Sequence, residues 1–388
     1  MKISDFKSGC YYDQIDIDGF NLNFKSFCPN LINLDWNVDI PQLQSLLSEA
    51  DYKLGELNAF SQLVPDINFF ISMHIAKEAN QSSKIEGTQT NIEDIIIKRE
   101  DISPEKRDDW QEVQNYINAI NFSIKELERL PISTRLICQA HKILLQGVRG
   151  KNKLPGEYRN SQNWVGGTSL KDATYIPPPY LKINELMNDL ENFIHNKDIY
   201  TPHLIKIAII HYQFETIHPF LDGNGRIGRL LITLYLVSNN LLNVPALYLS
   251  NFLEKNKTHY YNNLNTVRIV SDLQQWIKFF LIGIIETSES SINTFKNIIK
   301  LRDEIDDVKI PSLRSKSKME NARKLICFLY KKPVITLNDI SKEMEFEITT
   351  ANRLIKDFQS LGILKEFTGY KRNRMFEFSD YIDLFKQP

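Results

Sequence analysis

The segment His218–Arg229, with the sequence HPFLDGNGRIGR, constrains this chain more than any other. Apolar residues recur at helical spacing both before and after it, so two helices meet there. The glycines, Asp222 and Asn224 lie between those helices and break both of them. The sequence therefore predicts a short turn that leads directly into the N-terminus of a helix.

This turn has the chemistry of an anion site. Gly223 and Gly225 lack a Cβ, so backbone N–H groups can surround a phosphate. The first turn of the following helix adds unpaired N–H groups and the positive end of its dipole. Arg226 and Arg229 lie one helical turn apart, and both can bind phosphate oxygens in a forked geometry. Any one of these residues would be typical of a plain helix–helix connection, but together they favour a polyphosphate site.

Two further side chains in the same segment carry chemistry. Asp222 offers a hard carboxylate oxygen, which suits a Mg²⁺ ion that bridges phosphates. His218 lies just upstream, and an imidazole can take the proton of a hydroxyl near neutral pH. One loop therefore combines a general base, a metal ligand and a phosphate clamp.

The segment resembles the motif of the Fic family, His-x-Phe-x-(Asp/Glu)-Gly-Asn-Gly-Arg-x-x-Arg, and every fixed position matches. A weaker resemblance extends over residues 50–290. Fic proteins mostly transfer AMP from ATP to a protein hydroxyl. The resemblance implies that His218 is the general base and that Asp222 holds Mg²⁺ or Mn²⁺. It also implies a set of ATP-binding residues, of which the last would hold the γ-phosphate: Gly223, Asn224, Gly225, Arg226 and Arg229.

A shorter motif lies nearer the N-terminus. An apolar stripe predicts a helix over about residues 66–87, and Gly87 is suited to end it. The stretch from Ser82 to Gly87 resembles the Fic inhibitory motif, (Ser/Thr)-x-x-x-Glu-(Gly/Asn). By this resemblance Glu86 and Ser82 are inhibitory, and Glu86 pairs with Arg229. Without the resemblance, Glu86 would be a solvated carboxylate at a helix end.

The rest of the sequence predicts a mainly α-helical fold in three parts. We expect an N-terminal arm and helical region over residues 1–100, a Fic catalytic core over 101–300 and a C-terminal winged helix-turn-helix domain over 310–388. A change of composition from about Asp303 predicts an exposed linker before the last part. Glycines, prolines and aromatic residues over about 156–178 predict a β-hairpin. In Fic proteins this hairpin is a flap that holds the target segment by strand addition.

Charge and composition exclude several classes of protein. The net charge of the 388 residues is −1, so no overall field attracts nucleic acid or membranes. The four cysteines have no paired spacing, which argues against a zinc ribbon and against a disulfide framework. No apolar run is long enough to span a membrane, and the N-terminus has no apolar signal core. We therefore expect a cytoplasmic protein. From residue 310 onward, 15 Lys and Arg residues outnumber 10 Asp and Glu residues, which permits DNA contact.

The resemblance predicts a protein adenylyltransferase that moves AMP from ATP to a Ser, Thr or Tyr hydroxyl of a target protein docked on the flap. Self-modification, a homodimer and DNA contact through the winged helix are further hypotheses about its partners. Three alternatives stay open. In the first, Glu86 positions water for the removal of AMP. In the second, the site transfers another nucleotide-derived group. In the third, the chain is a DNA-binding regulator that only senses ATP.

Overall fold

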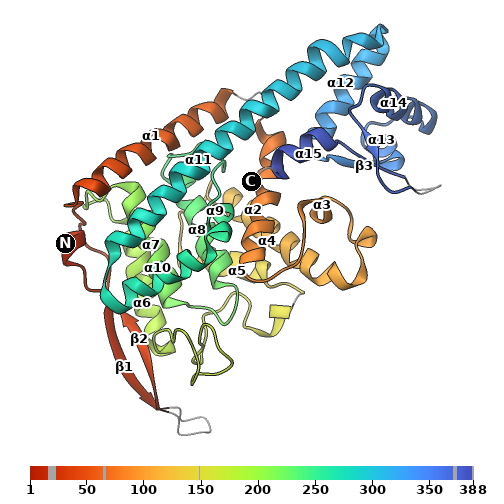
Figure 1. Ribbon diagram of the computed structural model, residues 1–388. Helices are drawn as coiled ribbons and strands as arrows, with labels where there is room; N and C mark the ends of the chain where they lie inside the picture. Colours follow the sequence, from red (N-terminus) through yellow and green to blue (C-terminus); the bar gives the residue numbers. More distant parts are fainter. Residues whose placement is uncertain (16–22, 64–66, 148, 370–373, 387–388) are drawn as a thin grey trace.

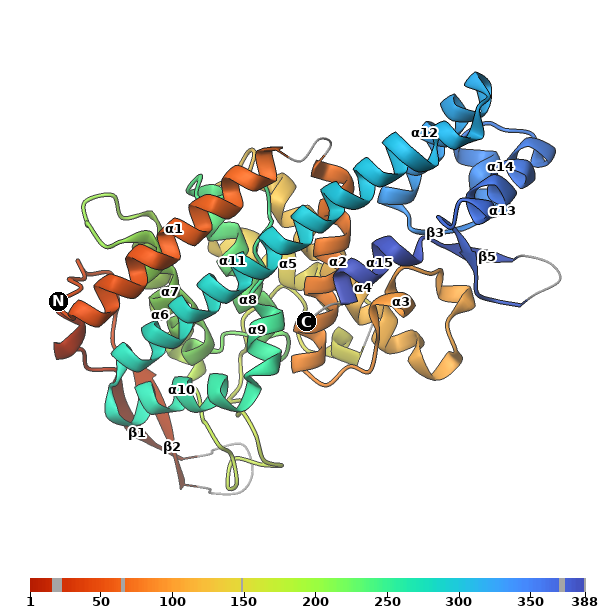
Figure 2. The same cartoon turned by 45° about the horizontal axis from the view of Figure 1, so that its top comes forward.

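The computed structural model describes residues 1–15, 23–63, 67–147, 149–369 and 374–386. The protein is mainly helical, as the sequence predicts. Its longest helix, α11 (Leu273–Glu304), crosses the molecule beside α1 (Pro41–Leu63) (Figures 1 and 2).

Two antiparallel helices, α7 (His203–Ile217) and α8 (Asn224–Ser238), form the centre of the body. Every residue of α7 from Leu204 to Ile217 is buried. Most of these side chains are apolar, as expected for a helix enclosed on all sides, and the buried polar ones include His211 and Gln213, which form hydrogen bonds. The segment between these two helices is therefore held at both ends by buried helices of the core.

Other helices surround this pair. The predicted inhibitory helix is α2 (Ile67–Ile85), which packs on α4, α8 and α9. Its expected first residue, Asp66, lies outside the described residues. The remaining helices of the body are α3 (Ile92–Ile95), α4 (Arg107–Glu126), α5 (Thr134–Leu144), α6 (Ile183–His195), α9 (Ser250–Lys255) and α10 (Lys257–Val270).

Two hairpins extend from one end of the body. In the first, β1 (Gly9–Ile15) pairs antiparallel with β2 (Asn23–Pro29). The predicted flap over about 156–178 is a hairpin with a single bridge, in which the Val165 N–H donates to the Tyr175 carbonyl at 2.8 Å. Glycines on one side of the bridge and prolines on the other prevent longer pairing. The Phe27 N–H donates to the Ile176 carbonyl at 2.9 Å, so the flap is attached to β2.

The C-terminal part contains a helix, a small sheet and further helices. The antiparallel sheet has the order β3–β5–β4. Its description as a winged helix stays a prediction. The elements are α12 (Lys316–Lys331), β3 (Val334–Thr336), α13 (Leu337–Glu343), α14 (Ile348–Ser360), β4 (Lys365–Glu366), β5 (Met375–Glu377) and α15 (Ser379–Lys386).

The exposed linker expected from about Asp303 is not found. The chain continues from α11 as a π-helical turn, Ile305–Lys309, and Ile305 and Ile310 are both fully buried. Acidic residues and a proline suggested a linker, but isoleucines between them continue the apolar stripe. The C-terminal part is therefore packed against the body and is not a separate unit on a tether.

Aromatic rings form much of this contact. Phe70 of α2 is buried, and its ring centroid lies 5.0 Å from that of Tyr330 on α12 and 6.1 Å from that of Tyr381 on α15. Both views show α15 beside α2 and α11 (Figures 1 and 2). The inhibitory helix is therefore held at its N-terminal half by the C-terminal part of the chain.

Removal of the Phe70 ring should destabilise the protein. We expect Phe70→Ala to lower the free energy of unfolding by about 3–5 kcal/mol, because it removes a buried aromatic ring and leaves a cavity. Denaturant titration measures the change. Phe367→Ala is the control, since that ring is 43% exposed. Equal losses in the two variants would show that the Phe70 contact does not stabilise the protein.

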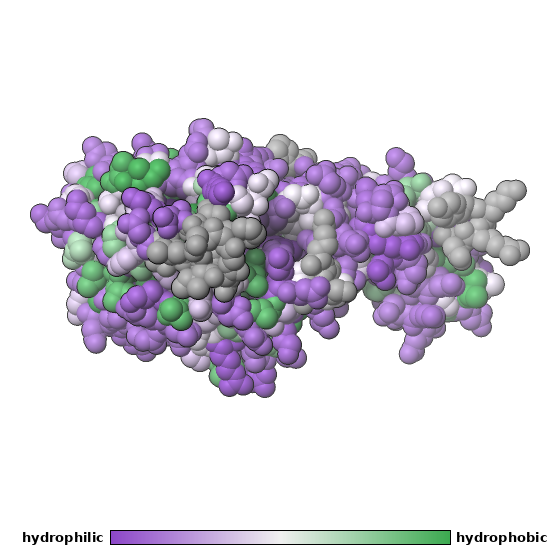
Figure 3. Space-filling model, turned by 90° about the horizontal axis from the view of Figure 1, so that it is seen from below, coloured by the Kyte–Doolittle hydropathy of each residue, from purple (hydrophilic) through white to green (hydrophobic). Residues whose placement is uncertain are grey.

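The surface seen from below is mostly hydrophilic, with hydrophobic residues in separate small patches (Figure 3). Among the described residues, no helix combines the length and the apolar character needed to cross a bilayer.

Candidate active site

The segment between α7 and α8 is a tight loop with fixed ends. His218 ends α7 in the left-handed conformation, with φ of 51°, and Gly223 begins α8 with φ of 77°. The Asn224 side chain closes the loop, because its Oδ1 accepts the Phe220 N–H at 2.8 Å and its Nδ2 donates to the Phe220 carbonyl at 2.8 Å. The Asn224 side chain therefore has a structural role in the loop.

The N-terminus of α8 lies close to Glu86 and Arg229. A Cβ on Gly225 would lie 2.3 Å from Oε1 of Glu86 and 2.9 Å from Nη1 of Arg229. Only glycine lets the carboxylate and the guanidinium approach the backbone so closely. Glu86 therefore occupies the space above the helix N-terminus, where the dipole and the free N–H groups favour an anion.

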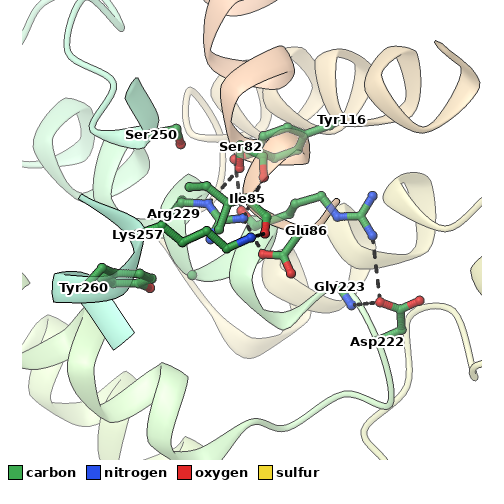
Figure 4. Close-up of polar contacts among 12 residues, drawn as sticks. Ser82, Ile85, Glu86, Tyr116, Asp222, Gly223, Arg229, Ser250, Lys257 and Tyr260 are labelled. Carbon is green, nitrogen blue, oxygen red and sulfur yellow. Dashed lines mark hydrogen bonds and ion pairs between the residues drawn. The ribbon is translucent and has the colours of Figure 1, made fainter. Parts of the chain in front are cut away.

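Arg229 is held by Ser82 of α2 and by Glu86, which directly follows that helix. Its Nη2 donates to Glu86 Oε1 at 2.6 Å and to the Ser82 carbonyl at 3.0 Å, and its Nε donates to Ser82 Oγ at 2.8 Å. Figure 4 shows Ser82 and Glu86 lying against Arg229 on the side of α2 that faces the loop. The Arg229 side chain is 1% exposed, whereas that of Glu86 is 34% exposed.

Both the Glu86 carboxylate and the Arg229 guanidinium are ionised. Burial works against the charge of Glu86, but the Arg229 guanidinium outweighs it and lowers the pKa of the carboxyl. Burial also works against the charge of Arg229, but the Glu86 carboxylate raises the pKa of the guanidinium above its ordinary value. Since the two groups are hydrogen-bonded and oppositely charged, their contact is of the strong, charge-assisted kind.

Arg226 and Asp222 lie on the other side of the loop. Arg226 is buried, and its Nη1 lies 3.4 Å from Glu112 Oε2. Its Nη2 lies 3.8 Å from Asp222 Oδ1, which also accepts the Gly223 N–H at 2.6 Å. The Asp222 side chain is 44% exposed, so its carboxylate is accessible beside the helix N-terminus.

His218 is in an unusual electrostatic environment. Burial, together with the positive charges of Arg159 and Arg268, lowers its pKa to about 3. Its Nδ1 is buried and accepts or donates no hydrogen bond among the described residues. The imidazole is therefore neutral at physiological pH and keeps a lone pair that can accept a proton.

Comparisons with known proteins agree with this geometry. Residues 44–125 match the family model described as Fic/DOC family N-terminal, and residues 131–236 match the Fic/DOC family model, which contains the loop. The matched part of the chain belongs to the Fic/DOC family.

Two curated relatives of this chain are named as protein adenylyltransferases. A probable protein adenylyltransferase of Aquifex aeolicus is 32% identical over 177 residues, which cover 44% of this chain and 49% of that protein. The protein adenylyltransferase Fic of Drosophila erecta is 27% identical over 255 residues, which cover 63% of this chain and 46% of that protein. The chain thus spans about half the length of these curated relatives.

Solved structures share the fold. A Fic family protein from Desulfovibrio desulfuricans superimposes with a TM-score of 0.53 at 18% identity, over 88% of this chain and 97% of that one. A Fic domain containing signaling protein from Bacteroides thetaiotaomicron gives a TM-score of 0.51 at 18% identity, over 66% of this chain and 96% of that one.

The structure brings the predicted Fic residues together around one loop. His218, Asp222 and the start of α8 lie on the loop itself, and Glu86 and Ser82 reach it from α2. Arg229 points to α2, not into free space. The roles of these residues in catalysis and binding stay predictions.

Three residues that position the loop were not predicted. Arg159 Nε donates to the His218 carbonyl at 3.0 Å, and Arg268 Nη2 donates to the Glu215 carbonyl at 3.2 Å. The third, His141, bonds the Asp222 carbonyl through Nε2 at 2.9 Å and accepts the Gly156 N–H at Nδ1. Each is distant from the loop in sequence, so spacing gave no signal.

A buried carboxyl, Glu215, also lies beside the Fic loop without having been predicted. It precedes His218 by one helical turn on α7, and a Cβ on Gly228 would lie 2.2 Å from its Oε1. Burial raises the pKa of Glu215 to about 7, against the opposing effect of Arg229. An acidic residue one turn before the motif histidine, in a helix rich in apolar residues, was the available signal.

A divalent cation fits the loop only with help from a substrate. The described residues contain no group of three or more His, Cys, Asp or Glu side chains that would hold a metal ion. The half-exposed Asp222 carboxylate offers hard oxygen, and Mg²⁺ commonly takes one or two carboxylates and completes its shell with water and phosphate oxygens. The residues present therefore fit Mg²⁺ or Mn²⁺ that arrives with a nucleotide.

The lowered pKa of His218 has a measurable consequence. An imidazole with its ordinary pKa of about 6.5 loses its neutral form as the pH falls through that value. We expect kcat/KM for AMP transfer by the Glu86→Gly/Glu215→Gln variant to stay level from about pH 8 to about pH 6, because this ratio reports the groups of the free enzyme and the second substitution removes the neighbouring carboxyl whose pKa is about 7. A pH–rate profile that bends near the ordinary imidazole pKa would contradict this electrostatic environment.

Proposed function

We propose that this chain is a protein adenylyltransferase whose activity is restrained by Glu86. The observation that carries the proposal is the arrangement of the loop, in which a neutral His218 and the N-terminus of α8 flank one space, with Arg229 at its edge. The names of the curated relatives support the same activity. The restraint is supported by the hydrogen bonds from Arg229 to Ser82 and Glu86.

In the proposed reaction, a Ser, Thr or Tyr hydroxyl of the target protein loses its proton to His218. Its oxygen bonds to the α-phosphorus of ATP, and the bond from that phosphorus to the β-phosphate oxygen breaks. The products are the AMP ester of the target and pyrophosphate. His218 acts only on the proton, so its neutral form is the one required.

The remaining residues of the loop bind and orient the phosphates. The N–H groups of Asn224 and Gly225 at the start of α8 would face the charge that develops during transfer. The Gly223 N–H would join them after leaving Asp222 Oδ1, to which it donates at 2.6 Å. Arg226 and Arg229 add guanidinium donors, and Arg229 must first be released from Glu86. Asp222 would hold Mg²⁺ or Mn²⁺, which neutralises phosphate charge when it is bound.

Target binding is proposed at the flap. Backbone groups of a single-bridged hairpin are available to an added strand, which needs few particular side chains in the target. Exposed Arg353 and Lys356 on α14 would carry DNA contact in the C-terminal part. Self-modification, a homodimer and a cytoplasmic location stay predictions.

The proposal is tested by the position of the transferred label. The full chain is incubated with cell extract and with ATP labelled at either the α- or the γ-phosphate. We expect a labelled protein band with the α-label only, since pyrophosphate carries the γ-phosphate away. A band with the γ-label would indicate phosphorylation. In a parallel incubation with α-labelled UTP, a band that appears there and not with ATP would indicate transfer of another nucleotide.

A further inference from the structure

The C-terminal end of α2 has a contact with a residue that lies outside both Fic motifs. Lys257, the first residue of α10, donates from Nζ to the Ile85 carbonyl at 2.5 Å. Ile85 is the last residue of α2 and directly precedes Glu86. Figure 4 shows the Lys257 side chain extending from α10 toward Ile85 and Glu86. A cation therefore lies at the helix end that carries Glu86.

The last four carbonyl groups of an α-helix have no partner within the regular part of that helix. In α2 all four accept a hydrogen bond: Ser82 from Arg229 Nη2 at 3.0 Å, Ser83 from the Glu86 N–H at 3.0 Å, Lys84 from the Gly87 N–H at 3.0 Å and Ile85 from Lys257 Nζ. Lys257 thus satisfies the carbonyl that lies next to the Glu86 backbone. Loss of its ammonium group would loosen the end of α2.

The helix that carries Lys257 is itself fixed to the core. Tyr260 lies one turn later on α10, is 1% exposed, and its hydroxyl lies 2.9 Å from Nε2 of His211. Since a carbonyl can only accept, Nδ1 of His211 donates to the Gly228 carbonyl at 3.0 Å, and Nε2 of the neutral ring accepts the Tyr260 proton. These hydrogen bonds connect α10 to α7 and α8. The start of α10 is therefore fixed relative to Arg229, which follows Gly228.

Contacts at three successive turns attach α2 to the helices that follow the Fic loop. The Ser250 hydroxyl of α9 donates to Glu78 at 2.5 Å, and Arg229 of α8 donates to Ser82 Oγ at 2.8 Å. The residues of these two contacts are buried, whereas Lys257 is exposed. Replacement of Lys257 therefore leaves no buried cavity, so a change in activity would report on the position of Glu86 and not on folding.

We propose that Lys257 is a positioning residue for the restraint on AMP transfer. Its ammonium group fixes the Ile85 carbonyl and thereby keeps Glu86 within reach of Arg229. A cation at the C-terminus of a helix also interacts favourably with the helix dipole. The inference rests on the proposed function, in which Glu86 restrains transfer, and Lys257 acts only through Glu86. Loss of Lys257 relieves part of the restraint and leaves the chemical step unchanged.

Labelling of the full chain and of cell extract with α-labelled ATP at saturation tests the inference in two backgrounds. Lys257→Met keeps the length of the side chain and removes the donor. We expect it to raise transfer by the otherwise wild-type protein at least about threefold, the lower part of the effect of a charged hydrogen bond because Lys257 is exposed. In the Glu86→Gly background it should have no effect, since the carboxylate that it positions is absent.

Two further variants serve as controls. Lys257→Arg keeps a positive donor and should transfer AMP at the wild-type level. Lys278→Met removes an exposed lysine of α11 and should also have no effect. No gain by Lys257→Met, or an equal gain in the two backgrounds, would overturn the inference. A loss of transfer by Lys257→Met in the Glu86→Gly background would also overturn it, because Lys257 would then act on the reaction directly.

Hydrogen–deuterium exchange separates a failure of this inference from a failure of the proposed function. The N–H groups of Glu86, Gly87 and Thr88 donate to carbonyls of the last turn of α2, so their exchange reports whether that end is fixed. We expect faster exchange at these groups in Lys257→Met and wild-type exchange in Lys257→Arg. Unchanged exchange in Lys257→Met would overturn the positioning role. Faster exchange without any gain in transfer by Glu86→Gly would instead overturn the proposed restraint.

Discussion

Glu86→Gly is expected to raise AMP transfer onto protein by at least about tenfold. A hydrogen bond to a charged partner contributes roughly 1.5–3 kcal/mol. At about 1.4 kcal/mol per tenfold, this corresponds to a suppression of roughly ten- to a hundredfold. Because the Glu86 side chain is 34% exposed, solvent screening favours the lower end of this range. Labelling with α-labelled ATP at saturation measures the change.

The second residue of the pair supplies the control. Arg229→Ala added to Glu86→Gly should cancel the gain, since both residues act on the same phosphate and their effects are not additive. The substitution at Glu86 itself should be tolerated, because the residue lies after the end of α2. Labelling by folded Glu86→Gly at or below the wild-type level would favour a role for Glu86 in AMP removal.

His218→Ala is expected to reduce transfer by about a hundred- to ten-thousandfold, which is the usual contribution of a general base. ATP affinity should change little, because the phosphate contacts come from α8 and its arginines. A filter-binding assay and a labelling assay on the same preparation separate the two effects. His259→Ala is the control, since His259 is exposed on α10. Transfer by His218→Ala at the wild-type rate would exclude the general-base role.

The sequence was sufficient to predict the loop and the inhibitory contact. Both depend on short motifs whose residues are fixed by local geometry, such as Gly223 at a positive φ and Glu86 one turn after Ser82. The pairing of Glu86 with Arg229 spans 143 positions and is found at 2.6 Å. That contact was predicted from the family resemblance, because spacing alone does not report so distant a partner.

The features that the sequence did not reveal depend on long-range packing. Arg159 holds the loop and Arg268 holds the last turn of α7 through backbone carbonyls, which carry no side-chain pattern. The supposed linker near Asp303 contained apolar residues whose partners lie elsewhere in the fold, so its composition was misleading. The contact of Phe70 with Tyr330 likewise could not be predicted, since either ring alone would be typical of any helix core.

The central claim is that His218 transfers AMP once Glu86 no longer holds Arg229. Mass spectrometry of peptides from Glu86→Gly and Glu86→Gly/His218→Ala, each incubated with ATP and cell extract, tests it most directly. The account predicts AMP esters on Ser, Thr or Tyr hydroxyls in the Glu86→Gly sample and a loss of nearly all of them in the double variant. Equal amounts of AMP ester in the two samples, or none in the Glu86→Gly sample, would contradict it.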